Sequence, residues 1–202
     1  MNLQNMNDQQ LINEYNKIAD NDKQRARFLQ ELDRLDQMKH AHLRRPEALR
    51  ESALWYAENN IAIFPLQPRT KIPLAGSRGL KDATTNIEQV KAWWDLIPDA
   101  NIAIVTGYGF DVIDIDGSEG FDSIAQMKTR PNILASVITP RPGRHWMIAS
   151  KPERKNGTNI QPGIDIRAKG GYVVAPPSIN KDGKVYQWMI TPEKLVNLHD
   201  HR

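Results

Sequence analysis

Two aspartates one residue apart, Asp114 and Asp116, end an apolar stretch of the chain. If this stretch is a strand, both carboxylates project from one face while Ile113 and Ile115 point into the core. Two carboxylates on one face repel each other unless a cation lies between them. The spacing suits the divalent metal ions used in phosphoryl and nucleotidyl transfer. A second interpretation is that Asp116 caps a helix, because Glu119 follows it three residues later as in a capping box. This segment alone leaves both interpretations open.

Two later segments place polar side chains on further predicted strands. In the first, Trp146 faces the core and His145 faces the opposite side. In the second, Asp165 and Arg167 alternate with two isoleucines, and a glycine turn with an apolar strand follows at 169–178. A carboxylate pair, a histidine, and a third carboxylate with an arginine would suit a metal-dependent reaction on a phosphate chain.

Hydrophobic periodicity predicts the elements that must position these side chains. The strand pattern occurs at about 61–66, 101–106, 110–116, 136–140, 144–149, 163–168, 171–175 and 185–190. The helical pattern occurs between residues 8 and 42 and at about 46–58, 86–96, 118–129 and 192–198. Strands mixed with few helices, and several hairpin-like neighbours, favour an α+β fold over a doubly wound parallel sheet.

The Arg45-Pro46 pair marks a boundary, since Pro46 suits the first turn of a helix. We therefore expect an N-terminal helical segment over residues 1–45 and one larger domain over residues 46–202. The apolar stripes of the segment should pack on each other or on the domain; they are Leu11/Tyr15/Ile18 and Phe28/Leu32/Leu35. The segment is either a structural cover or a surface that recognises a template or partner. The second alternative is favoured by the basic residues Lys23, Arg25, Arg27, Arg44 and Arg45.

Composition excludes several classes of protein. The chain has 202 residues, a hydrophobic fraction of 40% and a net charge of +3, which fit a globular protein and do not by themselves show a nucleic-acid partner. The absence of cysteine excludes disulfides and thiolate metal sites. No apolar run approaches the ~18 residues of a membrane span. The first residues carry no signal-peptide pattern, so we expect a cytoplasmic protein with no membrane partner.

Taken together, the polar motifs form an ordered set. They are Asp-x-Asp at 114–116, Gly-Arg-His-Trp at 143–146, and Gly-Ile-Asp-Ile-Arg followed by Gly-Gly-Tyr-Val-Val-Ala-Pro-Pro-Ser within 163–178. This set resembles the bifunctional primase–polymerase (prim-pol) domain of phage and plasmid replication proteins, in the archaeo-eukaryotic primase superfamily. The segments similar to the family's opening are 61–66, 71–73, 80–85, 93–94 and 98–107. The resemblance covers about residues 49–188. It implies a core of mixed and antiparallel β-sheet with flanking helices.

The resemblance also implies an activity, that of a template-dependent nucleotidyltransferase that uses Mg²⁺ or Mn²⁺. Its partners would be single-stranded DNA, a primer–template and nucleoside triphosphates. The implied metal ligands are Asp114, Asp116 and Asp165. His145 would bind a phosphate oxygen, Arg167 would pair with the triphosphate or the template backbone, and the loop that contains Lys71 would flank the site. Family members often continue into a helicase module, so we expect such a module or partner.

The middle motif departs from the family pattern. Many members of the superfamily have Ser-x-His at this place, and the serine helps to hold the incoming triphosphate. The present triplet is Gly143-Arg144-His145, as in the glycine version of phage and plasmid members. Phosphate contacts would then fall to backbone N–H groups or to Arg144, Arg141 or Thr139. The sequence leaves open which of these takes over.

Two other functions fit the same motifs. A metal-dependent nuclease would use the same carboxylates without consuming nucleoside triphosphates. A non-catalytic nucleic-acid-binding module for replication initiation would have a degenerate acidic cluster, and the complete set of three aspartates counts against it. The sequence does not distinguish de novo priming from extension, or ribonucleotides from deoxyribonucleotides.

Overall fold

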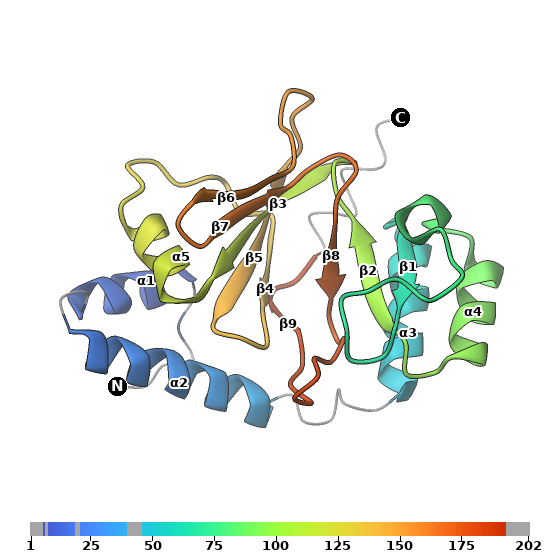
Figure 1. Cartoon of the computed structure of the whole chain (residues 1–202), viewed down its shortest axis with the longest axis horizontal. Coiled ribbons are helices and arrows are strands. Elements are labelled where there is room, and N and C mark those ends of the chain that lie inside the picture. Colours follow the sequence, from blue (N-terminus) through green and yellow to red (C-terminus); the bar gives the residue numbers. More distant parts are fainter. Residues whose placement is uncertain (1–5, 7, 19–20, 40–45, 193–202) are drawn as a thin grey trace.

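Two antiparallel β-sheets form the centre of the molecule, and helices pack on each of them (Figure 1). The computed structural model describes residues 6, 8–18, 21–39 and 46–192. Every strand pair within the two sheets is antiparallel. The prediction of an α+β fold is confirmed. Within the described residues, no helix has both the length and the apolar character that crossing a bilayer requires.

The larger sheet has six strands in the order β6-β7-β3-β5-β4-β9. Their bounds are β3 Phe110–Asp116, β4 Ala135–Ile138, β5 Gly143–Ala149, β6 Gly157–Gln161, β7 Ile164–Arg167 and β9 Gln187–Ile190. Along β3, Val112 belongs to the main core, whereas Ile113 and Ile115 belong to a second apolar cluster. The two faces of β3 therefore alternate as the sequence predicted.

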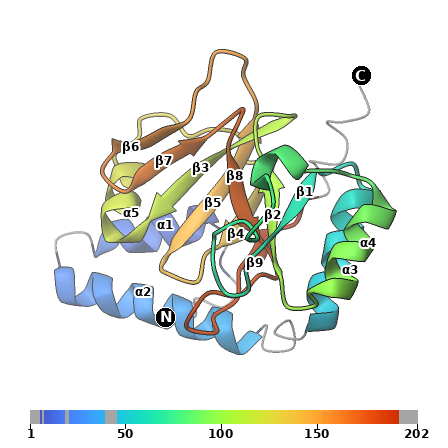
Figure 2. The ribbon, with the colours of Figure 1, turned by 45° about the vertical axis from the view of Figure 1, so that its right-hand side comes forward.

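The smaller sheet has three strands in the order β1-β2-β8. Their bounds are β1 Ile63–Leu66, β2 Asn101–Val105 and β8 Tyr172–Ala175. Helices α3 (Pro46–Glu58) and α4 (Ile87–Leu96) lie beside this sheet (Figure 2). The main core joins Tyr56 of α3 and Trp94 of α4 to Ile104 of β2 and Met147 of β5. One core is thus shared by both sheets.

Helix α5 (Gly117–Ala125) covers the larger sheet on the face opposite to the main core. It begins directly after β3 and places Ile124 in a cluster with Ile113, Ile115 and Trp146. This arrangement confirms that Trp146 is a core residue. The helix therefore packs directly on the strand that precedes it.

Helices α1 (Asp8–Lys17) and α2 (Asp22–Lys39) lie against α5 (Figure 1). Their buried side chains form a third cluster that includes Tyr15, Phe28, Leu32 and Phe121 of α5. The prediction that the N-terminal stripes pack on each other and on the domain is confirmed for these residues. The side chain of Leu35 lies outside the described residues.

Some expected elements differ in the structure. Strand β6 was not predicted, because its side chains are mostly exposed and show no apolar alternation. Helix α5 ends at Ala125 rather than near residue 129. Gly107 and Gly109 are typical of a hairpin turn, but the turn at 107–109 connects strands of different sheets. The helical turn expected at 192–198 falls almost wholly outside the described residues.

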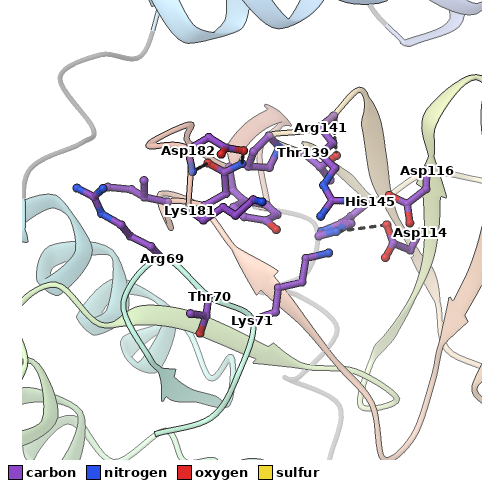
Figure 3. Close-up of a pocket in the computed structure, with 14 residues that line it drawn as sticks. Arg69, Thr70, Lys71, Asp114, Asp116, Thr139, Arg141, His145, Lys181 and Asp182 are labelled. Carbon is purple, nitrogen blue, oxygen red and sulfur yellow. Dashed lines mark hydrogen bonds and ion pairs between the residues drawn. The ribbon is translucent and has the colours of Figure 1, made fainter.

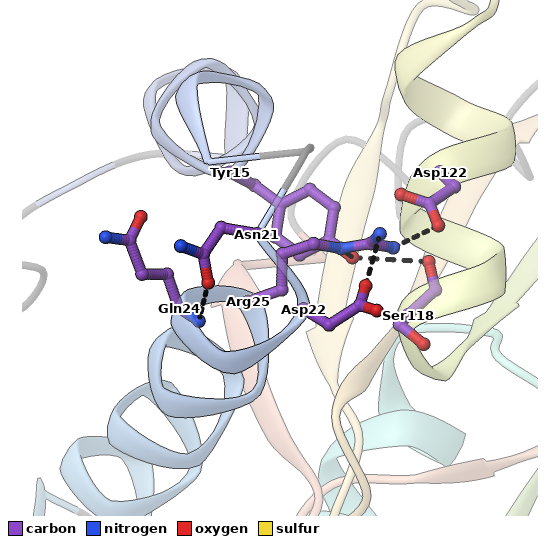
Figure 4. A network of polar contacts seen from close by, with 7 residues as sticks. All are labelled: Tyr15, Asn21, Asp22, Gln24, Arg25, Ser118 and Asp122. Carbon is purple, nitrogen blue, oxygen red and sulfur yellow. Dashed lines mark hydrogen bonds and ion pairs between the residues drawn. The ribbon is translucent and has the colours of Figure 1, made fainter.

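A polar network joins α1 and α2 to α5 (Figure 4). Arg25 Nε donates to Tyr15 Oη at 3.0 Å, and the Arg25 guanidinium forms an ion pair with Asp122 of α5. Tyr15 Oη donates in turn to the carbonyl oxygen of Ser118 at 3.4 Å. Arg25 therefore serves the packing of the helices, which favours the structural-cover interpretation for this residue. Residues 44–45 lie outside the described part of the chain.

Removal of the Arg25 side chain should weaken this packing. We expect Arg25→Ala to lower the free energy of unfolding by about 1–2 kcal/mol, because it removes hydrogen bonds to a carboxylate and a buried tyrosine. Arg34→Ala is the matched control, since Arg34 pairs with Glu31 on the exposed surface of the same helix and such pairs contribute little. Urea unfolding measures both variants. Equal stabilities would contradict a clamping role for Arg25.

Candidate active site

Three strands of the larger sheet bring predicted site residues into one row. Asp114 of β3 lies opposite His145 of β5 on one side and opposite Asp165 of β7 on the other. Directly opposed residues of antiparallel strands project from the same face. His145 Nε2 lies 3.4 Å from Asp114 Oδ1 (Figure 3). Three motifs that are far apart in the sequence therefore meet side by side.

Asp116 lies at the exposed end of β3, on the same face as Asp114 (Figure 3). It occupies the N-cap position of α5, but its side chain accepts no capping hydrogen bond. The capping-box interpretation is therefore wrong. The carboxylate of Asp116 instead lines the same cavity as Asp114.

The acidic residues influence one another's ionisation. Burial raises the pKa of Asp114, and the charge of Asp165 adds to this rise, whereas Lys71 and Arg167 oppose it. Partial burial also raises the pKa of Asp116, and the negative charge of Asp114 contributes next. A carboxylate whose pKa is raised by a neighbouring carboxylate gains from a cation beside both, because a positive charge removes the repulsion.

His145 is neutral in this environment. Burial, together with the positive charge of Lys71, lowers the pKa of His145 to about 3. A neutral imidazole has one donor nitrogen and one acceptor nitrogen. The Nδ1 atom has no hydrogen-bond partner within the described part of the chain. An unpaired buried polar atom costs about 1–3 kcal/mol, and a neutral imidazole retains one N–H that can donate to an acceptor.

Asp114 and Asp116 fit a divalent cation, since Mg²⁺ and Mn²⁺ prefer carboxylate oxygens. Asp165 is engaged differently: its Oδ2 accepts from Arg167 Nη2 and its Oδ1 accepts from the backbone N–H of Asn159, both at 2.7 Å. Among the residues that the structure describes, no group of three or more acidic or histidine side chains has the arrangement of a metal site. Asp165 would have to exchange these contacts to join the other two carboxylates.

A cavity of about 300 Å³, here called the Arg141 cavity, opens beside Asp114 and Asp116 (Figure 3). Four basic side chains line it as well, and Lys71 and Arg141 point towards the aspartates; the four are Arg69, Lys71, Arg141 and Lys181 (Figure 3). Thr139 Oγ1 donates to the carbonyl oxygen of Arg141 at 2.7 Å, which fixes the turn that carries this arginine. A cavity with carboxylates at one end and cations around it suits a metal-bound phosphate chain.

A second cavity of about 390 Å³, here called the Tyr172 cavity, shares Lys71, Asp114 and His145 with the first. Arg167 and Tyr172 line it as well. Tyr172 Oη donates to the carbonyl oxygen of Lys71 at 3.0 Å, so a strand of the smaller sheet holds the backbone of this lysine in place. Lys71 therefore borders both cavities and faces the acidic row of the larger sheet.

Arg144 does not lie with the residues that line these two cavities. It alternates with His145 along β5 and lies on the opposite face of the sheet, where it is buried. Its guanidinium carbon is 5.8 Å from the ring centroid of Phe121 in α5. Of the residues that sequence analysis offered as substitutes for the missing serine, only Thr139 and Arg141 line the Arg141 cavity.

The close approach of β5 to β3 explains why glycine replaces the serine of the superfamily pattern. Gly143 lies opposite Asp116, and a Cβ atom at this position would lie 2.4 Å from the carbonyl oxygen of Ile115 and 2.8 Å from Thr139 Oγ1. Such distances force a movement of backbone atoms. A larger residue at position 143 would therefore displace the strand end that carries Asp116.

The family model for the N-terminal domain of bifunctional DNA primase/polymerases, Prim-Pol, matches residues 53–200. The chain belongs to the Prim-Pol family. The matched segment begins within α3 and includes every strand of both sheets. Membership supports a primase/polymerase-type role in DNA replication, with DNA and nucleotides as substrates. A search of curated proteins gave no match.

Several residues that line the Arg141 cavity were not predicted from the sequence. Lys181 lies on the turn that closes between Ile179 and Val185, and Tyr186 follows it in the cavity wall. The turn-forming residues that follow the Pro-Pro-Ser motif do predict a turn at this place, but they do not predict that it lines a cavity. Arg69, two residues before Lys71 in the same loop, also lines the cavity.

The contacts of Gly143 lead to a prediction that contrasts with the superfamily pattern. Gly143→Ser should lower the free energy of unfolding by about 1–3 kcal/mol through overpacking, rather than improve nucleotide binding. Gly76→Ala is the control, because a Cβ there meets no atom within 4 Å and only its positive φ is strained. Thermal unfolding and nucleotide titration measure the two effects. A Gly143→Ser protein of unchanged stability and higher nucleotide affinity would refute the steric explanation.

Proposed function

We propose that this chain is a template-dependent nucleotidyltransferase, a DNA primase or polymerase that acts in phage or plasmid replication. The main support is that Asp114, Asp116 and His145 line one cavity together with Lys71 and Arg141, in a chain of the Prim-Pol family. The phage or plasmid context is supported by the glycine form of the middle motif. The resemblance to replication proteins also supports cooperation with a helicase module or partner.

Asp114 and Asp116 would hold Mg²⁺ or Mn²⁺, and Asp165 would complete the site after releasing its present contacts. When bound, the metal ions lower the pKa of the attacking 3′-hydroxyl and neutralise the triphosphate and the leaving pyrophosphate. The chemistry of the donor set supports this assignment, since burial raises the pKa of both carboxylates and the charge of Asp114 raises that of Asp116.

The other residues of the cavity would bind and orient the nucleotide. The neutral ring of His145 would donate a hydrogen bond to a phosphate oxygen, and Lys71 and Arg141 would pair with the charges of the triphosphate. Arg167 would turn from Asp165 to the triphosphate or to the template backbone. Phosphoryl transfer depends mostly on positioning and charge neutralisation, so these contacts need no covalent nucleophile beside them.

An extension assay tests the proposal. A labelled primer–template and an unprimed single strand are each incubated with Mg²⁺ or Mn²⁺ and with ribo- or deoxyribonucleotides. We expect the primer to be lengthened. Shortening of the strands without nucleotide consumption would instead favour a metal-dependent nuclease, and absence of both changes would favour a non-catalytic binding module.

The same assay tests the carboxylates. Asp114→Asn and Asp116→Asn should abolish incorporation, because a neutral amide replaces the charge that a divalent ion needs. We expect Mn²⁺ to raise the melting temperature of the wild-type protein, and each variant should lose this rise. Glu51→Gln, an exposed change on α3, is the control. Wild-type incorporation by either aspartate variant would refute the assigned metal role.

His145 gives a separate test of nucleotide binding. We expect His145→Gln to raise the KM for the nucleotide by roughly 10- to 100-fold, because a hydrogen bond to a charged phosphate contributes about 1.5–3 kcal/mol. Affinity for DNA should change much less. Steady-state kinetics and DNA titration separate the two quantities. A variant with an unchanged nucleotide KM and weakened DNA binding would place His145 on the nucleic acid instead.

A further inference from the structure

A third cavity of about 500 Å³ is lined by no residue of the acidic row, and we call it the Tyr108 cavity. Its walls include the apolar side chains of Ile61, Leu80, Val105 and Phe110. Tyr108 lines it and is 42% exposed, which makes it one of the few large exposed hydrophobic residues in the described chain. The proposed nucleotidyl transfer does not use this cavity.

The backbone presents Tyr108 in a fixed position. Gly107 and Gly109 both have positive φ angles, +87° and +84°, which leave the aromatic residue at the tip of a tight turn. The Gly107 N–H donates to the carbonyl oxygen of Phe110 at 2.7 Å. A Cβ atom on Gly107 would lie 2.1 Å from the Cα atom of Lys169, so this turn packs directly on the turn before β8.

The turn before β8 is itself held by hydrogen bonds. Thr106 Oγ1 donates to the carbonyl oxygen of Ala168 at 2.7 Å, and the Thr106 N–H donates to that of Gly171 at 3.1 Å. Asn156 Nδ2 donates to the carbonyl oxygen of Lys169 at 3.0 Å. The exposed Lys169 thereby stands beside Tyr108, with its Nζ atom 5.8 Å from the ring centroid. An aromatic surface and a cation are thus preorganised together.

The Tyr108 cavity adjoins the active site. Gly170 lines both this cavity and the Tyr172 cavity, and the latter contains Asp114 and His145. Arg167 and Lys71 line the Tyr172 cavity, so cations continue from the acidic row towards Lys169. A polyanionic strand that leaves the active site in this direction would meet positive charge along its way.

We propose that the Tyr108 cavity binds an unpaired base of the single-stranded DNA template, with the base stacked on Tyr108 and a neighbouring phosphate paired with Lys169. Single-strand binding sites combine aromatic stacking surfaces with basic residues that follow the backbone, and these are the two features that the two turns bring together. The cavity is large enough and apolar enough for a base. Identification of the strand as the template rests on the proposed function.

Tyr108 is tested by binding of labelled oligothymidylate to the full chain, followed by fluorescence anisotropy. Tyr108→Ala should weaken binding by about 5- to 100-fold, which is the usual range for loss of one stacked base. Tyr108→Phe keeps the ring and should keep the affinity. Trp55→Ala removes an exposed aromatic residue of α3 and is the control for a general surface effect. Wild-type affinity of Tyr108→Ala, or equal losses in Tyr108→Ala and Trp55→Ala, would overturn the proposal.

Lys169 gives an independent test that does not alter the turn. Lys169→Gln should reduce the slope of log affinity against log salt by about 0.7, the value for one phosphate contact on a single strand. An unchanged slope would overturn the assigned phosphate contact. Tyr108→Ala and Lys169→Gln should both retain the wild-type melting temperature, which is measured in parallel.

Two further measurements are needed. The first shows whether the base belongs to the strand or to a free nucleotide, and the second tests the proposed function separately from the stacking site. If Tyr108→Ala loses affinity for oligothymidylate but not for a free nucleoside triphosphate, the base belongs to the strand; equal losses for both would overturn the assignment to the template. Extension of an annealed primer by the wild-type protein reports on the proposed function alone. Normal extension with no effect of Tyr108→Ala on strand binding would refute only the stacking site.

Discussion

The register of β3 between β5 and β7 is the constraint on which the site depends. Asp114 meets His145 and Asp165 only in this pairing. A shift of one residue would turn Asp114 and Asp116 towards the apolar cluster of Ile113 and Ile115. Burial of these isoleucines beneath α5 therefore fixes the position of the carboxylates on the other face. Packing of the isoleucines against α5 thus stabilises a strand whose other face carries two carboxylates that repel each other.

The N-terminal helices extend this constraint. They contact the sheet mainly through α5, whose Phe121 lies in their apolar cluster and whose Asp122 pairs with Arg25. Phe121 also lies against the guanidinium of Arg144, the neighbour of His145 on β5. The helices thus pack, through α5, on the face of the sheet opposite to the one that carries Asp116 and His145. The boundary at residue 45, drawn from sequence alone, remains a prediction.

Local alternation was enough to predict much of the fold and part of the site. The isoleucines of β3 and β7 and Trp146 of β5 reported directly which face each strand buries, so the shared face of Asp114 and Asp116 followed from the sequence. The same alternation along β5 places Arg144 on the face opposite to His145. Arg144 was nevertheless expected at the phosphate, because it belongs to the same motif as His145. Strand β6 carries no apolar pattern, so its pairing with β7 had no signal in the sequence.

Contacts between distant loops could not be predicted in the same way. Lys181 and Arg69 reach the Arg141 cavity from turns whose paths depend on the whole fold, and polar turns look alike whether they face solvent or a ligand. The partnership of Asp165 with Arg167 and Asn159 is another such case. Spacing placed Asp165 and Arg167 on one face, but it gave no information about which charge the carboxylate would face.

The hydrogen bond from Tyr172 to the backbone of Lys71 joins the two sheets at the site. The acidic row belongs to strands of the larger sheet, whereas Lys71 and Arg69 belong to a loop that follows β1 of the smaller sheet. Loops accept substitutions and insertions more readily than paired strands do. Substitutions in this one loop can therefore change the charges that face the cavity, while the paired strands keep Asp114 and Asp116 in place.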